Sequence, residues 1–179
     1  MKNSTARYVI LFLAGTTLIF LDQATKLHVM QSMRLHESIP IIPGFFNLTY
    51  IRNPGAAFGL LASSGATFRM IFFGFASLFA LGLLSTIFYR LREDDRIGQV
   101  SIVAILGGAI GNLLDRIRYG EVIDFLDFYI GAYHWPAFNV ADTAITVGVV
   151  FLVLHYRLET KKEKDSASKL ATDRGTHDK

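Results

Sequence analysis

The chain has 179 residues, of which 51% are hydrophobic and 18% are charged, and its mean hydropathy is +0.37. Soluble domains carry about 25% charged residues, so this composition argues against a helical bundle in water. The sequence holds no cysteine, which excludes a disulfide framework, a zinc–thiolate site and a thiol nucleophile. The basic residues behind the net charge of +3 are spread over loops and a tail, which argues against nucleic-acid binding.

Four long apolar runs predict an all-α membrane protein with four transmembrane helices. They lie at about residues 8–27, 69–89, 97–114 and 141–157. A helix needs about 20 mostly apolar residues to cross a bilayer. The second and third runs meet this requirement outright, and the other two meet it if each tolerates a polar residue near one end. Residues 1–157 are therefore expected to form one membrane-embedded domain, and the charged residues 158–179 a disordered cytoplasmic tail.

The distribution of Lys and Arg predicts how the helices are oriented. The N-terminus, the loop at residues 90–96 and the tail hold twelve of the eighteen basic residues. Basic residues accumulate on the cytoplasmic side, so both termini are expected there. Four acids, at Asp22, Asp115, Asp124 and Asp142, then fall near the outer interface. Acids at membrane depth are costly, and their gathering on one side indicates a functional site.

The connection between the first two helices predicts a small extracytoplasmic β-sheet, or cradle, at about residues 40–60. The segment "FFNLTYI" alternates apolar and polar side chains, which is typical of a half-exposed strand. Pro54 and Gly55 suit the central positions of a type II turn. An ordinary loop hairpin is the alternative. The second outer connection predicts a platform along the membrane surface, from its aromatic residues Tyr119, Tyr129, Tyr133 and Trp135.

Carboxylates and amides are the groups left to perform chemistry. The five histidines show no metal-ligand spacing, and no metal or cofactor is expected. The segment "GGAIGN" lies inside a predicted helix, where small residues let helices approach closely. Two aspartates that share one proton can activate water and protonate a leaving group. Such a pair at the outer interface could hydrolyse a peptide bond.

Each acid also has a purely structural interpretation. Asp142 could cap the fourth helix, and for an isolated Asp before a helix that reading is the commoner one. Asp22 could pair with Lys26 one turn away, and Asp115 with Arg116. Asp124 and Asp127 could lie on a solvated loop face. Spacing alone does not decide which two acids form a pair.

Four motifs resemble those of the lipoprotein signal peptidases, or signal peptidase II, of bacterial inner membranes. They are "LDQATK", "RNPGAAFG", "GGAIGNLLDRIRYGEVIDF" and "PAFNVADTAIT", which begin at residues 21, 52, 107 and 136. The resemblance covers nearly the whole chain except the tail. It implies an aspartic endopeptidase that cuts prolipoproteins just before a diacylglyceryl-modified cysteine.

The resemblance also assigns residues and partners. It implies that Asp124 and Asp142 are the catalytic pair. The supporting or substrate-binding positions would be Asp22, Lys26, Asn53, Gly55, Asn112, Asp115, Arg116 and Asn139. Prolipoproteins, membrane lipids and an inhibitor of the globomycin type are the expected ligands. The expected location is the bacterial cytoplasmic membrane, with the active site near its periplasmic interface.

Two questions stay open at this level. A small proton-coupled transporter and a non-catalytic assembly subunit are the rival functions, although no internal repeat is visible. Within the pair, a helix N-terminus favours an anion, so Asp142 is the better candidate for the base. Asp124 would then hold the proton if it is the more buried of the two.

Overall fold

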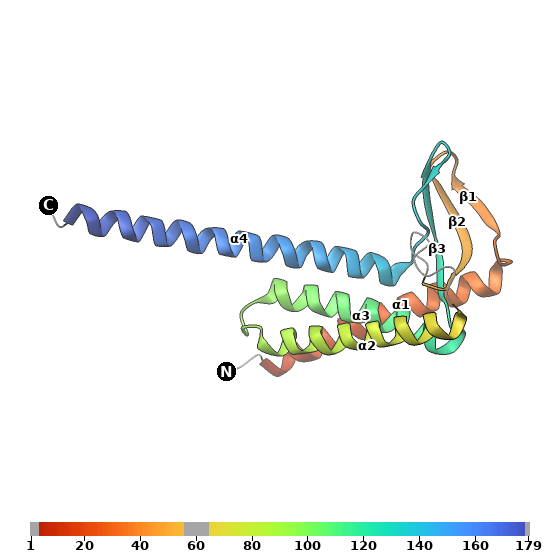
Figure 1. Ribbon diagram of the computed structural model, residues 1–179, viewed down its shortest axis with the longest axis horizontal. Coiled ribbons are helices and arrows are strands. Elements are labelled where there is room, and N and C mark those ends of the chain that lie inside the picture. The colour runs from red at the N-terminus through yellow and green to blue at the C-terminus, as the bar shows by residue number, and fades with distance from the viewer. Residues whose placement is uncertain (1–3, 56–64, 178–179) are drawn as a thin grey trace.

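The computed structural model describes residues 4–55 and 65–177, and within them the helices and strands form one bundle capped by one sheet (Figure 1). The elements in chain order are α1 (Ser4–Ser32), β1 (Ser38–Ile42), β2 (Phe46–Asn53), α2 (Ala66–Arg90), α3 (Arg96–Tyr119), β3 (Val122–Ile130), β4 (Tyr133–His134) and α4 (Val140–His177). The sheet lies across one end of the bundle, and both termini lie at the other end (Figure 1).

All four helices are long and apolar enough to cross a membrane, which confirms the predicted spans. Their outer faces carry exposed apolar side chains such as Phe12, Phe20 and Phe75, each about 70% exposed. In a water-soluble bundle these side chains would be buried, whereas lipid solvates them without cost. Each helix is longer than predicted, because its ends extend into polar residues that hydropathy does not count.

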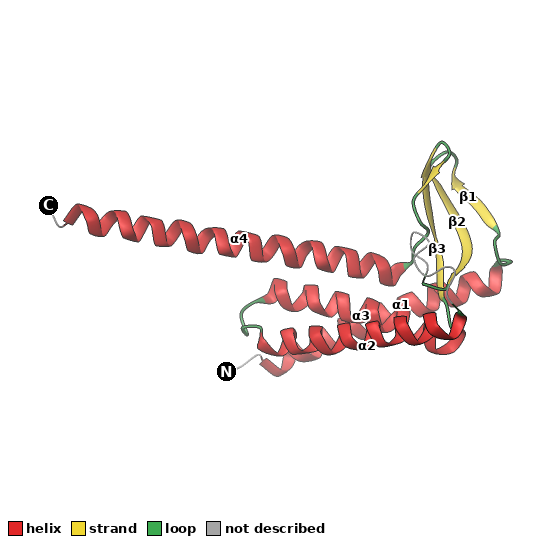
Figure 2. Cartoon of the chain, in the orientation of Figure 1, coloured by secondary structure: helices red, strands yellow, loops and turns green. Residues whose placement is uncertain are grey.

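The sheet is antiparallel, with the strand order β1-β2-β3-β4. This confirms the small antiparallel sheet predicted between the first two helices, where β1 and β2 lie. The sheet also holds two strands that were not predicted. β3 and β4 come from the connection between α3 and α4, which was expected to form a surface platform (Figure 2). β3 has the sequence "VIDFLDFYI". This run is rich in β-branched and aromatic residues, which favour a strand, but its two aspartates interrupt the apolar pattern. Residues 56–60 of the predicted cradle lie outside the described residues.

The predicted disordered tail is also wrong over residues 158–177, because α4 continues through them to His177. Half of the residues in this segment are Lys, Glu, Ala or Leu, and the segment lacks proline. These residues have high helix propensity, so a helix already begun in the membrane propagates through them. In Figure 1, α4 extends beyond the other three helices on the side of the termini.

α3 is the central helix and packs against α1, α2 and α4. Its glycines allow this close packing, as the "GGAIGN" segment predicted. A Cβ at Gly108 would overlap the carbonyl oxygen of Ala141, so any side chain there would push α4 away. A small apolar core then joins the end of α1 to the sheet, through Val29, Met33, Tyr50, Ile123 and Phe125. This core fixes β3 against the bundle and therefore fixes Asp124.

Candidate active site

A cavity of about 700 Å³ opens where the sheet meets the helix ends. Its lining includes Asp124 from β3, Asp142 from α4 and Arg116 from α3. Asn53 and Gly55, at the end of β2, complete its polar wall. The cavity therefore gathers five of the ten site residues that the resemblance names, from four separate segments of the chain.

Asp124 lies in the middle of β3, opposite Ile51 of β2, and is 2% exposed. Its Oδ2 atom accepts a hydrogen bond from Asn53 Nδ2 at 2.9 Å, and its Oδ1 atom accepts one from Asn139 Nδ2 at 2.7 Å. Burial raises the pKa of Asp124 to about 7, and the nearby charge of Asp142 acts in the same direction. The carboxyl group is therefore able to hold a proton near neutral pH. The alternative interpretation of Asp124, as part of a solvated loop face, is therefore wrong.

Asp142 lies in the first turn of α4 and is half-buried. Its Oδ1 atom accepts a hydrogen bond from Asn112 Nδ2 at 2.7 Å. The cap of the helix is the preceding Asn139, whose Oδ1 atom accepts from the backbone N–H of Asp142 at 2.9 Å. Asn139 therefore caps α4, a role that the sequence analysis had considered for Asp142. The Asp142 carboxylate remains directed to the cavity.

Asn139 connects the two acids. It is fully buried, and its Nδ2 atom also lies 3.2 Å from the carbonyl oxygen of Ile123 and 3.3 Å from Asn112 Oδ1. The amide nitrogen of Asn139 thus donates to Asp124, while its amide oxygen caps the first turn of α4, which carries Asp142. One side chain therefore sets the relative position of the two carboxylates.

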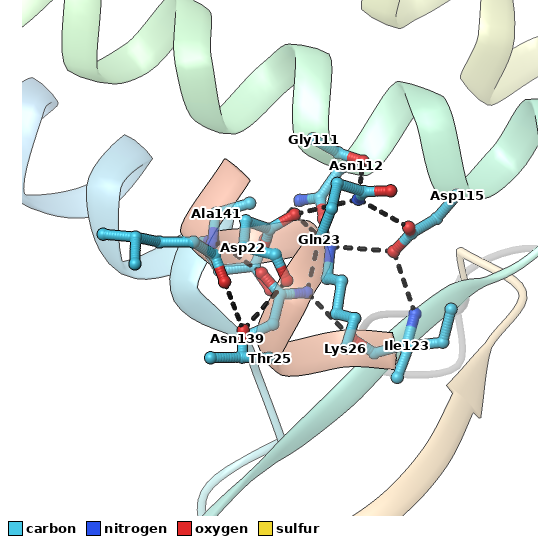
Figure 3. A network of polar contacts seen from close by, with 12 residues as sticks. Asp22, Gln23, Thr25, Lys26, Gly111, Asn112, Asp115, Ile123, Asn139 and Ala141 are labelled. Atoms are coloured by element: carbon cyan, nitrogen blue, oxygen red, sulfur yellow. Dashed lines mark hydrogen bonds and ion pairs between the residues drawn. The ribbon is translucent and has the colours of Figure 1, made fainter. Parts of the chain in front are cut away.

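Behind the cavity lies a buried charge network centred on Lys26 (Figure 3). Lys26 Nζ lies 2.9 Å from Asp22 Oδ2, 2.7 Å from Asp115 Oδ2 and 2.9 Å from Asn112 Oδ1. All four side chains are at most 6% exposed. The predicted pairing of Asp22 with Lys26 is confirmed, whereas Asp115 pairs with Lys26 and not with Arg116. Because Lys26 holds the oxygen of the Asn112 amide, the nitrogen of that amide is left to donate to Asp142.

Asp22 and Asp115 also accept hydrogen bonds from the backbone. The N–H of Ala141 donates to Asp22 Oδ1 at 2.9 Å, which satisfies a free donor in the first turn of α4. The N–H of Ile123 donates to Asp115 Oδ2 at 3.3 Å. The network therefore fixes the residues directly before Asp124 and Asp142 in the chain.

Gln23 belongs to this network but was not predicted. Its Nε2 atom donates to Asp115 Oδ1 at 2.9 Å (Figure 3). Its Oε1 atom accepts a hydrogen bond from Arg118 Nη1 at 2.8 Å. It stands inside the motif "LDQATK", next to Asp22. Nothing in the spacing distinguishes its amide from that of an ordinary polar helix residue, and only the position of α3 reveals its role.

Gly55, just after β2, has the positive φ that the predicted turn needs. Gly55 has a φ of 95°, as the third position of a type II turn requires. The N–H of Gly55 donates to Asn53 Oδ1 at 2.9 Å, which orients the Asn53 amide nitrogen toward Asp124. The rest of the "RNPGAAFG" motif, residues 56–59, lies outside the described residues.

Fold and site together define a multi-pass membrane protein with two carboxylates on one cavity at the sheet-covered end of its helix bundle. Within the described residues, no group of His, Asp and Glu side chains is arranged to hold a metal ion. The protein thus belongs to the membrane proteins whose functional groups are paired carboxylates with neighbouring amides.

Comparisons with known proteins identify the family. The family model described as signal peptidase (SPase) II matches residues 14–158, and the chain belongs to this family of peptidases. It is 54% identical to a lipoprotein signal peptidase of Syntrophus aciditrophicus, over 87% of this chain and 97% of that protein. It is 52% identical to one of Desulforapulum autotrophicum, over 85% of this chain and 94% of that protein.

Solved structures agree with this assignment. One described as a bacterial membrane enzyme structure at 2.3 Å resolution superposes with a TM-score of 0.76 at 33% identity, covering 86% of this chain and 90% of that one. A second, at 1.9 Å resolution, gives a TM-score of 0.73 at 35% identity, covering 82% and 92%. The bundle and sheet are therefore the fold of the family, which confirms the resemblance seen in the sequence.

Proposed function

We propose that this protein is an aspartic endopeptidase that removes signal peptides from prolipoproteins by cutting before a diacylglyceryl-modified cysteine. The observation that carries the proposal is the cavity that both Asp124 and Asp142 line. The names of the bacterial relatives, lipoprotein signal peptidases, support the substrate class.

The two carboxylates have unequal surroundings, which suits a division of roles. Asp124 is the more buried and has a pKa of about 7, so it holds the shared proton. Asp142, in the first turn of α4, is stabilised as an anion by the positive end of the helix. In the proposed reaction Asp142 takes a proton from water as the water oxygen attacks the scissile carbonyl carbon. Asp124 gives its proton to the carbonyl oxygen, which forms a tetrahedral gem-diol. Asp142 then gives its proton to the nitrogen of the modified cysteine as the C–N bond breaks, and Asp124 recovers a proton from a hydroxyl of the gem-diol, so that the signal peptide leaves with a free carboxyl end.

The remaining site residues hold this pair in place. Asn139 and Asn112 donate to the two carboxylates, and Asn53 donates to Asp124 from the turn above. Lys26, Asp22 and Asp115 fix the backbone that carries the acids. Arg116, on the cavity wall, binds the backbone of the substrate near the bond that is cut. The pair supplies both acid and base, so the proposal needs no metal and no cofactor.

The proposal places the site at the periplasmic interface of the bacterial cytoplasmic membrane. Its supports are the twelve basic residues of the termini and the α2–α3 loop, and the position of both termini opposite the sheet (Figure 1). Membrane lipids surround the bundle, and a globomycin-type inhibitor would occupy the cavity in place of the substrate. Nucleic acid is not a proposed partner.

The test is cleavage of a purified, lipidated precursor by the wild type, Asp124→Asn and Asp142→Asn. Asparagine is nearly isosteric with aspartate but exchanges no proton, so each variant should lose about 10²- to 10⁴-fold or more in kcat. Each should keep the wild-type elution profile and a cooperative thermal transition in detergent. Appreciable turnover by either variant would remove that residue from the pair. A wild type that does not cleave would favour the transporter or assembly-subunit functions.

A further inference from the structure

Phe73 of α2 lies between the turn after β2 and Arg116 of α3. Among the described residues that line the cavity, it is the one that α2 contributes. A Cβ on Gly55 would overlap the Phe73 ring, so the ring edge is seated directly against the turn. The ring thus occupies the space that a side chain at position 55 would need.

The face of the same ring carries Arg116. The guanidinium carbon of Arg116 lies 5.6 Å from the centroid of the Phe73 ring, within the range of a cation–π contact. The other contact that holds this side chain is a long hydrogen bond of 3.3 Å from its Nη1 atom to the carbonyl oxygen of Asn112. Within the described residues no carboxylate forms an ion pair with Arg116. The position of this cation therefore depends largely on the Phe73 ring.

Arg116 is a cation of the cavity wall whose charge interacts with both proposed catalytic acids. It is half-buried, and its charge interacts with those of Asp142, Asp115 and Asp124. A planar guanidinium stacked on a ring keeps its N–H edge free for a carbonyl or carboxylate partner. If the ring is removed, the side chain is free to swing toward the acids and neutralise Asp142.

We propose that Phe73 is a positioning residue, which holds the Arg116 guanidinium on the cavity wall where it meets the substrate backbone and keeps it from pairing with Asp142. This inference rests on the proposed function, because Arg116 matters here through the peptide that the cavity binds. The proposal gives α2 a role in the site, although none of the four sequence motifs lies in this helix. It also explains the need for glycine at position 55, since the ring that carries Arg116 occupies that space.

Phe75 supplies a matched control. It lies two residues further along α2, is 71% exposed, and does not line the cavity. The adjacent Phe72 is unsuitable, because its ring packs edge-to-face on the Phe73 ring with centroids 5.2 Å apart. A Phe→Leu change at position 75 removes the same atoms from the same helix on its exposed face.

The experiment measures kcat and KM on a lipidated precursor for Phe73→Leu, Phe73→Tyr and Phe75→Leu, with thermal unfolding of each variant. A cation–π contact at a half-buried site is worth about a five- to thirtyfold change in equilibrium, so F73L should lose about that factor in kcat/KM. F73Y keeps the aromatic face and should restore most of that loss, while F75L should match the wild type. Equal losses in F73L and F73Y, with unchanged thermal stability, would overturn the proposal.

A double variant separates positioning from simple packing. In an Arg116→Gln background the cation is gone, so adding F73L should cost little more than R116Q alone. If F73L costs the same factor in both backgrounds, Phe73 acts independently of Arg116 and the proposal is wrong. If the wild type itself leaves the precursor uncut, the proposed function fails, which is a different outcome from either of these.

Discussion

Asn139 shows at the scale of one residue how the site is assembled. Its amide nitrogen donates to Asp124, and its amide oxygen caps the helix that carries Asp142. Neither alanine nor aspartate could do both, because alanine has no polar group and aspartate no donor when ionised. The side chain is fully buried, so water does not replace either bond. A single amide thus couples the geometry of the pair to the start of α4.

Asp124 makes the stability of the fold depend on pH. Its pKa is raised to about 7, whereas an unfolded chain has an Asp pKa of about 3.9. The folded state therefore binds the proton more tightly, and this contribution to stability, complete below about pH 3.9, is lost as pH rises through about 7. Asp124→Asn removes the titration, so its Tm relative to wild type should climb from pH 5 to about pH 7 and then level off. Thermal unfolding in detergent at pH 5, 6, 7 and 8 measures this.

The control for this prediction is Asp94→Asn. Asp94 is exposed, and its hydrogen bond with Arg92 lowers its pKa, so it is ionised throughout this pH range. The D94N and wild-type curves should therefore run parallel from pH 5 to 8. Parallel curves for D124N would mean that Asp124 keeps an ordinary pKa. The proposed proton holder would then have to be the other acid.

At the scale of the elements, hydropathy predicted the helices because lipid imposes one simple requirement, about 20 apolar residues in a row. Half of the sheet was not predicted. β3 carries Asp124 and Asp127 in an otherwise apolar strand, and its partner β2 lies 69 to 82 residues earlier in the chain. No local pattern reports such a partner. The acids were predicted to gather because they share one side of the bundle, whereas the positions of Gln23 and Phe73 depend on how α1 and α2 pack on α3.

The Lys26 network predicts a large stability effect from one substitution. Lys26→Met keeps the length and apolar stem of the side chain but removes the cation that Asp22 and Asp115 both contact. Two buried carboxylates would be left uncompensated, at a cost of about 3–5 kcal/mol. For a chain of this size Tm should fall by about 6–20 °C. Thermal unfolding of purified K26M in detergent at pH 7 measures this loss.

Arg92→Met is the matched control for Lys26→Met. Arg92 pairs with Asp94 at 3.0 Å, but both side chains are more than 70% exposed. Water solvates either partner when the other is removed, so Tm should stay at the wild-type value. Similar shifts in K26M and R92M would show that the buried network does not hold the helices together.

At the scale of the whole molecule, the arrangement of helices and sheet sets the depth of the site. α3 has 24 residues and is therefore about 36 Å long, slightly longer than the hydrocarbon core of about 30 Å. Arg116 lies in its last turn and Asp142 in the first turn of α4, so the proposed site lies near one end of the candidate membrane spans. The sheet covers this end of the bundle (Figure 1), and Asp124 of β3 lines the same cavity as Asp142. A bond can be cut here only if the substrate holds it at that height.

A lipid on the substrate would supply this height, and we predict that it matters more than the residues beyond the cut. Each methylene of a diacylglyceryl group that enters the bilayer contributes about 0.8 kcal/mol, which anchors the modified cysteine at the interface. The scissile bond is then oriented beside Asp124 and Asp142 before any side chain of the substrate is recognised. Precursor without the lipid, at equal membrane concentration, should lose about 10²-fold in kcat/KM. Substitutions two or three residues after the cysteine should change kcat/KM far less.

Asn53→Ala tests the other side of the same arrangement, because Asn53 holds Asp124 from the turn that covers the cavity. It should slow cleavage of the lipidated precursor while the bundle stays folded, since the turn lies outside the membrane helices. The lipid effect should persist in this variant, because the anchor acts on the substrate and not on the turn. If lipidated and unlipidated precursors were cut equally well by the wild type, the height of the site would not select the substrate. The chemistry of the two aspartates would still stand, and recognition would have to come from side-chain contacts in the cavity.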